Sequence, residues 1–427
     1  MNIVRRFLFV VKDYCLNSTL AGLSYIADPR FHLTERLFWL MCIVLSTYGS
    51  YALIYQSMVD FDESSISMVV EPIPIGTVLD FPSIGVCEVG HMKEVYSRLE
   101  ETVKKLRKNE DEEYNFDVED FLLRLVYLNL YNFGSYISYC SPYRDCTDCT
   151  KCPESNYSSF ADVVRQPCSK LLSSCIWNGK PFDCCEYFHP IQTTMGKCYL
   201  LNSIQNNEKY GKKWYPMKSG ESTVVDMLEL KIAKAVAITI LNEEDIPHML
   251  LSTLQFNQHY ENTIQDVLLG IQTVYNDPGV RDIDRKFRKC IFPDEAGKSR
   301  YKYYSYSACV TECLKDYQLR RCNCTHFNMI YDVKDNTRQC DYDGMACLDR
   351  TDLVFPQTTI MQPWRNGLVC DYCLPSCTEH EIKLIGRSLT TFPENGEKQR
   401  ITRIFMQTIS TQQYRRQAVR DNLDIVG

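Results

Sequence analysis

The sequence lacks the marks of several functional classes. It contains no GxSxG, HExxH or P-loop motif, and no spacing brings a nucleophile beside a base, so an enzyme is a distant third hypothesis and no cofactor is expected. The net charge of −7 is spread along the chain rather than collected in a tail, which gives no indication of a nucleic-acid partner. We find no internal repeat and no low-complexity tract.

Long apolar runs are also scarce, with one exception. Residues 37–59 carry no Asp, Glu, Lys or Arg, and a helix of this length crosses roughly 30 Å of hydrocarbon. Basic residues precede the run and Asp60, Asp62 and Glu63 follow it, so the N-terminus is predicted to be cytoplasmic. A cleaved signal peptide or a buried core helix is the alternative. The next best window, 223–241, is interrupted by four charged residues.

Cysteine, in contrast, is abundant. Twenty of the 22 cysteines follow the apolar run, whereas Cys15 and Cys42 precede it or lie within it. Because thiols stay reduced in the cytosol, this asymmetry predicts an extracellular, disulfide-bonded region beyond about residue 60. The length is compatible with two or three domains or with one elaborated ectodomain of about 350 residues.

The coarse pattern outside the membrane is mixed. Residues 81–87 are typical of a short strand, and 224–241 alternate in places as in a half-buried sheet. The charged run 100–113 is typical of a solvated helix face, and 117–133 predicts an amphipathic helix capped by Asp117. Two cysteine clusters, 140–198 and 290–377, complete the pattern.

Two cysteine spacings have other possible meanings. Cys146, Cys149 and Cys152 have zinc-like spacing, and Cys370 with Cys373 forms a CxxC of redox type. The seven histidines are scattered rather than placed at metal-ligand spacing, and the compartment is oxidising. Structural disulfides are therefore the preferred interpretation.

The second cluster carries a specific resemblance. Its elements are Tyr304-Ser305-x-Ser307-Ala308-Cys309-x-x-x-Cys313, then Cys322-x-Cys324, then Cys370-x-x-Cys373-Leu374-Pro375-Ser376-Cys377-x-Glu379. This pattern resembles the thumb signature of the degenerin/epithelial sodium channel family. Further matching motifs appear in order as Glu35-Arg36-x-x-Trp39, Phe81-Pro82 to Cys87, Cys175-x-Trp177-x-Gly179 and Gly196-x-Cys198-Tyr199-x-x-Asn202. The resemblance covers about 15–415 and looks closest to the insect pickpocket branch.

The resemblance implies a fold. It predicts a cytoplasmic segment 1–36, a membrane helix 37–59 and a disulfide-rich α+β ectodomain 60–414 with a palm sheet, a finger region at about 100–198 and thumb helices at about 285–380. The thumb would consist of two antiparallel helices with nested disulfides. The implied pairs are Cys290–Cys377, Cys309–Cys373, Cys313–Cys370, Cys322–Cys347 and Cys324–Cys340.

Further pairs follow from the same resemblance. Cys87 would join Cys198 in the palm, and Cys175 would join Cys184 or Cys185. The remaining one of that pair joins five cysteines in three bridges whose order stays open. These five are Cys140, Cys146, Cys149, Cys152 and Cys168.

Four other residues are candidates for function. Phe287 occupies the place of an aromatic that contacts the membrane helices in the family, and Ala21-Gly22 aligns with a His-Gly motif that bears on gating, so Gly22 is a candidate gating residue that lacks its usual neighbour. Asn156 and Asn323 begin outer N-glycosylation sequons, whereas the sequon at Asn17 is expected to face the cytosol.

One family feature is not matched. The resemblance implies that the second membrane span, with its Gly-x-Ser filter, begins within 415–427. These residues are expected to be the start of a truncated span, with the rest of that helix missing from the chain. The first hypothesis is a stimulus-gated, amiloride-sensitive type sodium channel subunit in the plasma membrane, which conducts sodium ions as a homo- or hetero-trimer. The alternative is a non-conducting single-pass receptor or modulatory subunit. Protons, peptides, small ligands and load stay open as stimuli.

Overall fold

The structure is a computed structural model in which the chain forms two compact units, described separately below. It describes residues 3–19, 22–63, 66–72, 78–89, 100, 117–127, 140–144, 147, 151–219, 225–248, 251, 254–295, 301–329, 336–351, 370–393, 399–407 and 412–418. Several predictions fall outside these ranges. They concern Ala21, Cys146, Cys149, most of the charged run 100–113, residues 128–133 and the end of the chain from 419.

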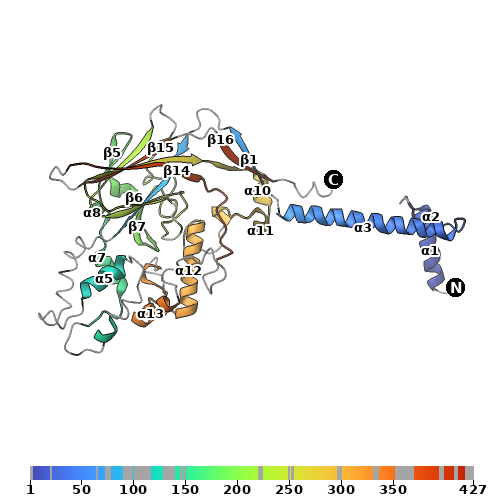
Figure 1. Cartoon of the computed structure of the whole chain (residues 1–427), viewed down its shortest axis with the longest axis horizontal. Coiled ribbons are helices and arrows are strands. Elements are labelled where there is room, and N and C mark those ends of the chain that lie inside the picture. The colour runs from blue at the N-terminus through green and yellow to red at the C-terminus, as the bar shows by residue number, and fades with distance from the viewer. Residues whose placement is uncertain are drawn as a thin grey trace. The chain divides into compact units, whose positions relative to one another are not determined.

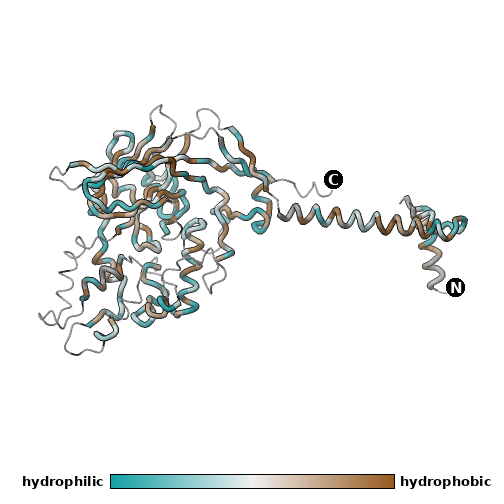
Figure 2. Tube along the Cα trace, in the orientation of Figure 1, coloured by the Kyte–Doolittle hydropathy of each residue, from teal (hydrophilic) through white to brown (hydrophobic). Residues whose placement is uncertain are grey.

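The first unit contains the membrane-type helix. It comprises Met1–Ser67, Asp277–Arg288 and Gln417–Gly427. Its helices are α1 (Ile3–Asn17), α2 (Leu23–Ala27), α3 (Leu33–Glu63), α10 (Pro278–Asp282) and α11 (Arg285–Arg288). Within α3, Leu33–Val59 has a mean hydropathy of 1.7 and none of its apolar window is buried (Figures 1 and 2). The predicted apolar helix therefore exists, and it starts four residues before position 37 because His32 and Glu35 already close its first turn: the His32 N–H donates to Glu35 Oε2 at 3.2 Å.

The second unit is built on two sheets, which we call the palm. The five-stranded sheet is antiparallel throughout and has the order β11 (Gln255–Gln258), β10 (Val236–Leu241), β3 (Ser83–Glu88), β7 (Gly196–Leu201) and β6 (Phe188–Thr193). The six-stranded sheet has the order β14 (Glu381–Thr391), β12 (Thr263–Gln272), β15 (Arg400–Gln407), β9 (Asp226–Ile232), β4 (Leu172–Trp177) and β5 (Lys180–Phe182). Here β12 and β15 run parallel.

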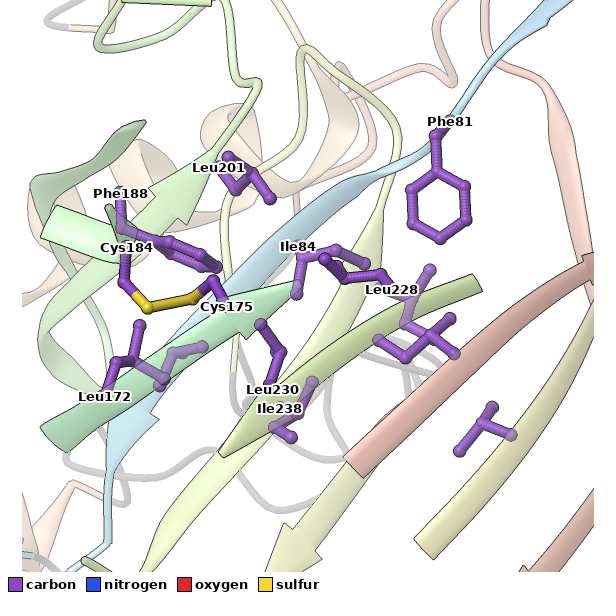
Figure 3. Close-up of a cluster of buried hydrophobic side chains, with 14 of the residues drawn as sticks. Phe81, Ile84, Leu172, Cys175, Cys184, Phe188, Leu201, Leu228, Leu230 and Ile238 are labelled. Carbon is purple, nitrogen blue, oxygen red and sulfur yellow. A yellow bond between two sulfur atoms is a disulfide. The ribbon is translucent and has the colours of Figure 1, made fainter. Parts of the chain in front are cut away.

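One hydrophobic core joins the two sheets. Strands β9 and β12 alternate buried and half-buried residues, as strands with one covered face do. Figure 3 shows side chains from both sheets meeting, among them Ile84, Ile238, Leu228 and Leu230. Strands β3 and β10 are buried along their whole length. The predicted strands in 81–87 and 224–241 are therefore central to this core.

A close approach in the palm requires glycine. A Cβ on Gly85 of β3 would lie 2.3 Å from Thr239 Oγ1 and 2.9 Å from a Leu200 methyl group. Strands β10 and β7, which carry these two side chains, flank β3 on either side. A larger residue at position 85 would therefore force the central strands apart.

The other described strands form two smaller sheets. Strands β2 (Leu79–Asp80) and β8 (Lys218–Ser219) form one, and β1 (Ile66–Pro72), β16 (Gln412–Ala418) and β13 (Val274–Asn276) form the other. Residues 415–418 thus belong to a strand and do not begin a second membrane helix, which corrects that prediction for these residues. The physical reason is their polarity: β16 reads QQYRRQA, and Arg415 pairs with Glu71 of β1 at 2.9 Å.

A second hydrophobic core lies among helices and disulfides. The Asp120 N–H donates to Asp117 Oδ1 at 2.9 Å, so Asp117 caps α5 (Val118–Tyr127) as predicted. Within the described part of this unit, the other helices are η2 (Ser141–Tyr143), α7 (Tyr157–Val164), α8 (Cys168–Leu171), α9 (Cys184–Tyr187), η3 (Pro293–Glu295), α12 (Tyr306–Cys322), η4 (Phe327–Met329) and α13 (Tyr342–Arg350).

Candidate functional site

The candidate site is the part of the second unit formed by α12, α13 and residues 370–377, which we call the thumb, together with its junction with the palm. Helix α12 begins where Ser305 Oγ accepts the N–H of Ala308 at 3.1 Å. It ends at Asn323, whose φ of 55° stops the helix in the left-handed conformation. Cys309 and Cys313 are four residues apart, so both point from one face of α12.

Five disulfides hold the thumb, with the pairs that the resemblance implied. Cys290–Cys377, Cys309–Cys373, Cys313–Cys370, Cys322–Cys347 and Cys324–Cys340 have Cα separations of 5.1, 5.7, 6.1, 5.8 and 4.9 Å. The pairs are nested in the sequence, with separations that fall from 87 to 16 residues. Each inner loop is therefore enclosed by outer bridges, which stiffens the whole segment.

The segment facing Cys309 and Cys313 is a turn. The Cys373 N–H donates to the Cys370 carbonyl at 3.0 Å, and the described residues 370–380 contain no helix. The resemblance implies two antiparallel helices that carry the ladder. Among the described residues, α12 is joined to this turn by two bridges and to α13 by Cys322–Cys347. Residues 352–369, which lead into the turn, lie outside the described ranges.

The base of the thumb is held by hydrogen bonds as well as by Cys290–Cys377. The Tyr304 hydroxyl donates to the Leu374 carbonyl at 2.6 Å and accepts the Leu374 N–H at 2.9 Å. The Ile291 N–H donates to the Pro375 carbonyl, and the Cys377 N–H returns to the Ile291 carbonyl, both at 3.0 Å. The chain entering the thumb is thus tied directly to the chain leaving it.

Two carboxylates, the buried Glu244 and the half-buried Asp245, join the palm to this base. Glu244 and Asp245 follow the last residue of β10 by three and four positions. Asp245 Oδ1 accepts the hydroxyl of Ser307, in the first turn of α12, at 2.7 Å. Glu244 Oε1 accepts the hydroxyls of Ser376 and Thr378, each at 3.2 Å. The palm is therefore hydrogen-bonded both to the start of α12 and to residues 376–378, where the chain leaves the thumb.

Burial makes these carboxyl groups hard to ionise. Burial, with the neighbouring Asp245 charge, raises the pKa of Glu244 to about 7, and burial raises the pKa of Asp245. Burial and the Asp245 charge also raise the pKa of Glu379 to about 7. A cavity of about 350 Å³ opens beside Asp245, Ser307 and Glu379. Protons can therefore alter the charge of this junction near neutral pH.

Arg416 connects the thumb base to β16. Its Nη1 donates to the Cys377 carbonyl at 2.9 Å, and burial lowers its pKa while Glu379 opposes that shift. Arg415, the next residue back, pairs with Glu71 of β1. Sequence reasoning missed Glu244, Asp245 and Arg416; a carboxylate run directly after an apolar strand was the available signal for the first two.

The comparison with protein families decides the identity of this architecture. A model described as the amiloride-sensitive sodium channel matches residues 14–427. The chain belongs to this family. The family is one of ion channels rather than enzymes, and membership together with the apolar helix α3 makes the chain a membrane protein.

Individual relatives of this sodium channel family are distant. Pickpocket protein 28 of Drosophila melanogaster is 23% identical over 416 residues, which are 86% of this chain and 62% of that protein. Pickpocket protein 19 is 22% identical over 418 residues, 90% of this chain and 79% of that protein, and sodium channel protein Nach is 20% identical over 388 residues, 79% and 66%, both from the same organism. The match thus spans less than two thirds of pickpocket protein 28.

Among the described residues, the remaining disulfides of this family member join palm strands or the helices beside them, except Cys140–Cys152, which lies in the second hydrophobic core. Cys87 and Cys198 face each other across β3 and β7 with a Cα separation of 4.4 Å. Cys175 pairs with Cys184, which leaves Cys185 to pair with Cys168, and Cys140 pairs with Cys152. These pairs supply the order that the sequence left open for the described cysteines. Cys15 and Cys42 carry free thiols.

The other candidate residues lie in separate places. Phe287 is half-buried on α11, with the Lys286 ammonium 5.6 Å from its ring. Gly22 has a φ of 98°, and a Cβ there would lie 3.2 Å from Trp39 and Ile43 of α3. Asn156 and Asn323 are exposed residues with φ values of 61° and 55°. Both side chains are accessible, as glycosylation requires.

Proposed function

We propose that this chain is a subunit of a trimeric, amiloride-sensitive type sodium channel of the plasma membrane, assembled as a homo- or hetero-trimer. Its N-terminus lies in the cytoplasm and its ectodomain outside the cell, because basic residues precede α3 and disulfides follow it. The description of the family and the name of the sodium channel protein Nach support the class of ion. In this proposal the ectodomain responds to an extracellular stimulus and drives the opening of the pore.

One observation carries the proposal. The disulfide-bonded thumb is hydrogen-bonded to β16, and β16 pairs with β1, the strand that follows the membrane helix α3. Arg416 of β16 binds the Cys377 carbonyl, and Arg415 binds Glu71 of β1. Strand β1 pairs with β16 and is the next element after α3 in the chain. A thumb that is stiffened by disulfides moves as one body, so its displacement can be transmitted to β16 and β1.

The test is expression in oocytes, alone and with related subunits, while extracellular stimuli are applied. Arg416→Met should reduce stimulated sodium current per channel at the surface, because the thumb base loses its bond to β16. Arg338→Met is the matched control, since Arg338 pairs with Asp341 on an exposed surface. A loss of current that merely follows a loss of surface protein would contradict the coupling. If the chain expressed by itself gives no current but changes the current of a co-expressed subunit, the result would favour the modulatory alternative.

Phe287 is proposed as a second coupling residue. Phe287→Ala should impair gating more than surface delivery, because it removes an aromatic side chain from α11, which belongs to the same unit as α3. Lys170→Ala, at an exposed lysine on α8 of the second unit, is the control. Surface biotinylation measured beside the current separates the two effects. Equal loss of current and surface protein in Phe287→Ala would count against a gating role.

Gly22 is also proposed to bear on gating. With φ at 98° and a Cβ position 3.2 Å from Trp39 and Ile43, any side chain would strain the turn and displace α2 from α3. This proposal does not depend on the thumb.

A further inference from the structure

Helix α1 presents an apolar face that the first unit leaves uncovered. Phe7, Val10, Val11 and Tyr14 follow one another at steps of three, one and three residues, so they share one side of a helix. Their exposed fractions are 67, 63, 41 and 66%. Lys12 and Asp13 are exposed on the other side, where Phe9 and Leu16 also lie. An apolar face of this size requires a partner.

The contacts of α2 fix the level of α1 on the membrane helix. The Tyr25 ring stacks on Trp39 with 4.8 Å between centroids, and it meets Phe31 edge-on at 5.2 Å. Gly22 lies against Trp39 and Ile43. Because Trp39 comes six residues after the start of α3, these contacts lie about 9 Å along the helix, in the N-terminal part of the apolar span Leu33–Val59. The α1–α2 pair is therefore held at the end of the membrane span.

The direction of α1 suits the membrane plane. Within this unit α1 runs crosswise to α3, as Figure 1 shows. If α3 crosses the bilayer, α1 lies along its surface. The sequence of α1 contains three basic residues and one acidic residue, a balance that favours anionic headgroups.

We propose that α1 is an interfacial anchor: its face formed by Phe7, Val10, Val11 and Tyr14 inserts into the same lipid monolayer from which α3 starts. The occupant of the apolar face is then lipid rather than a second protein chain. The inference depends on α3 as a membrane helix and not on sodium conduction. It adds a second, in-plane attachment that would resist rotation of the membrane helix.

The test is spin-label accessibility in the full chain reconstituted into phosphatidylcholine–phosphatidylserine vesicles. A Cys15→Ser/Cys42→Ser background removes the two free thiols, and its own labelling gives the blank. Cysteine is then introduced by Tyr14→Cys or Val11→Cys on the apolar face, and by Lys12→Cys as the matched control on the polar face. Labels that react with thiols without reductant leave the disulfides intact.

We expect the labels at positions 11 and 14 to collide with oxygen several-fold more often than with a water-soluble nickel complex, and the label at 12 to show the reverse. Preferential nickel access at 11 and 14 would place α1 in water and overturn the proposal. Exclusion of both reagents at 11 and 14 would mean burial against protein and would also overturn it. Because no current is measured, failure here is separate from failure of the proposed channel function.

Discussion

The thumb and the palm achieve rigidity by different means. The thumb has five disulfides around α12, whereas the palm has two sheets that share a core of branched aliphatic side chains, with the buried bridge Cys87–Cys198 joining β3 to β7. In the thumb every bridge except the outermost, Cys290–Cys377, is enclosed by another, whereas no bridge between described residues encloses Cys87–Cys198. The number of disulfides in a region is therefore a poor measure of what each one contributes.

The largest effect should come from the palm disulfide. Cys87 and Cys198 close a loop of 111 residues, so replacing both by Ala should cost about 5 kcal/mol in the chain-entropy model. Cys313–Cys370 lies within the loop that Cys309–Cys373 already closes, so its removal should cost only about 2 to 3 kcal/mol. Denaturant unfolding of the two double variants compares them. A thumb variant at least as destabilised as the palm variant would contradict this account of redundancy.

Core truncation should sharpen the same contrast. Leu228 of β9 and Leu348 of α13 are both fully buried, and Leu→Ala at either should cost about 2 to 5 kcal/mol in the oxidised protein. When the ten thumb cysteines are replaced by Ala and the palm bridges are kept, the thumb loses its constraint and Leu348→Ala should add nothing, while Leu228→Ala should still accelerate exchange of palm amides. Hydrogen exchange read separately at α12 and β9 makes the measurement. Equal responses in both regions would show that they unfold as one.

The junction between the two regions should depend on pH. The folded pKa of Glu244 is about 7 against an ordinary 4.5, so between these values the folded protein binds more protons than the unfolded chain. Stability should thus fall as pH rises from 4.5 to 7, by up to about 3 kcal/mol, and stay low above 7. Glu244→Gln should flatten much of this slope in pH-dependent unfolding, leaving the part due to Glu379. Glu208→Gln, at an exposed carboxylate, is the control and should leave the slope intact; an unchanged slope in Glu244→Gln would exclude this group as its source.

The sequence predicted features that have strong local or motif signals. The charge-free run predicted α3, Asp117 marked the start of α5, and the spacing of Cys309, Cys313, Cys370 and Cys373 matched a family pattern. What it could not predict depends on contacts distant in sequence. Arg416 is an ordinary basic residue until β16 brings it to the Cys377 carbonyl, 39 positions away.

The same limit explains the error at 415–418. A family pattern led us to expect a membrane helix there, but Gln412–Ala418 is polar, and its pairing with β1 and β13 gives its backbone groups partners in a sheet. The burial of Glu244 and Asp245 likewise follows from the approach of α12 and residues 376–378, which no local pattern encodes.

The smallest effect on stability is expected at the sequons, which nevertheless distinguish the thumb from the region around α7. Asn323 sits between Cys322 and Cys324, both bridged, whereas Asn156 precedes α7. Both have positive φ, which glycine adopts freely, so Asn323→Gly and Asn156→Gly remove each sequon with little strain. Each variant should lose one glycan. On a gel, the mobility shift that glycosidase treatment causes should be smaller by one glycan in each variant than in the unmutated protein.

The two sites should also differ in how completely they are modified. Because glycan transfer needs an accessible, unfolded sequon, rapid closure of the two bridges should leave Asn323 less completely modified than Asn156. Full occupancy at Asn323 and partial occupancy at Asn156 would reverse that order and would mean that the thumb forms its disulfides late.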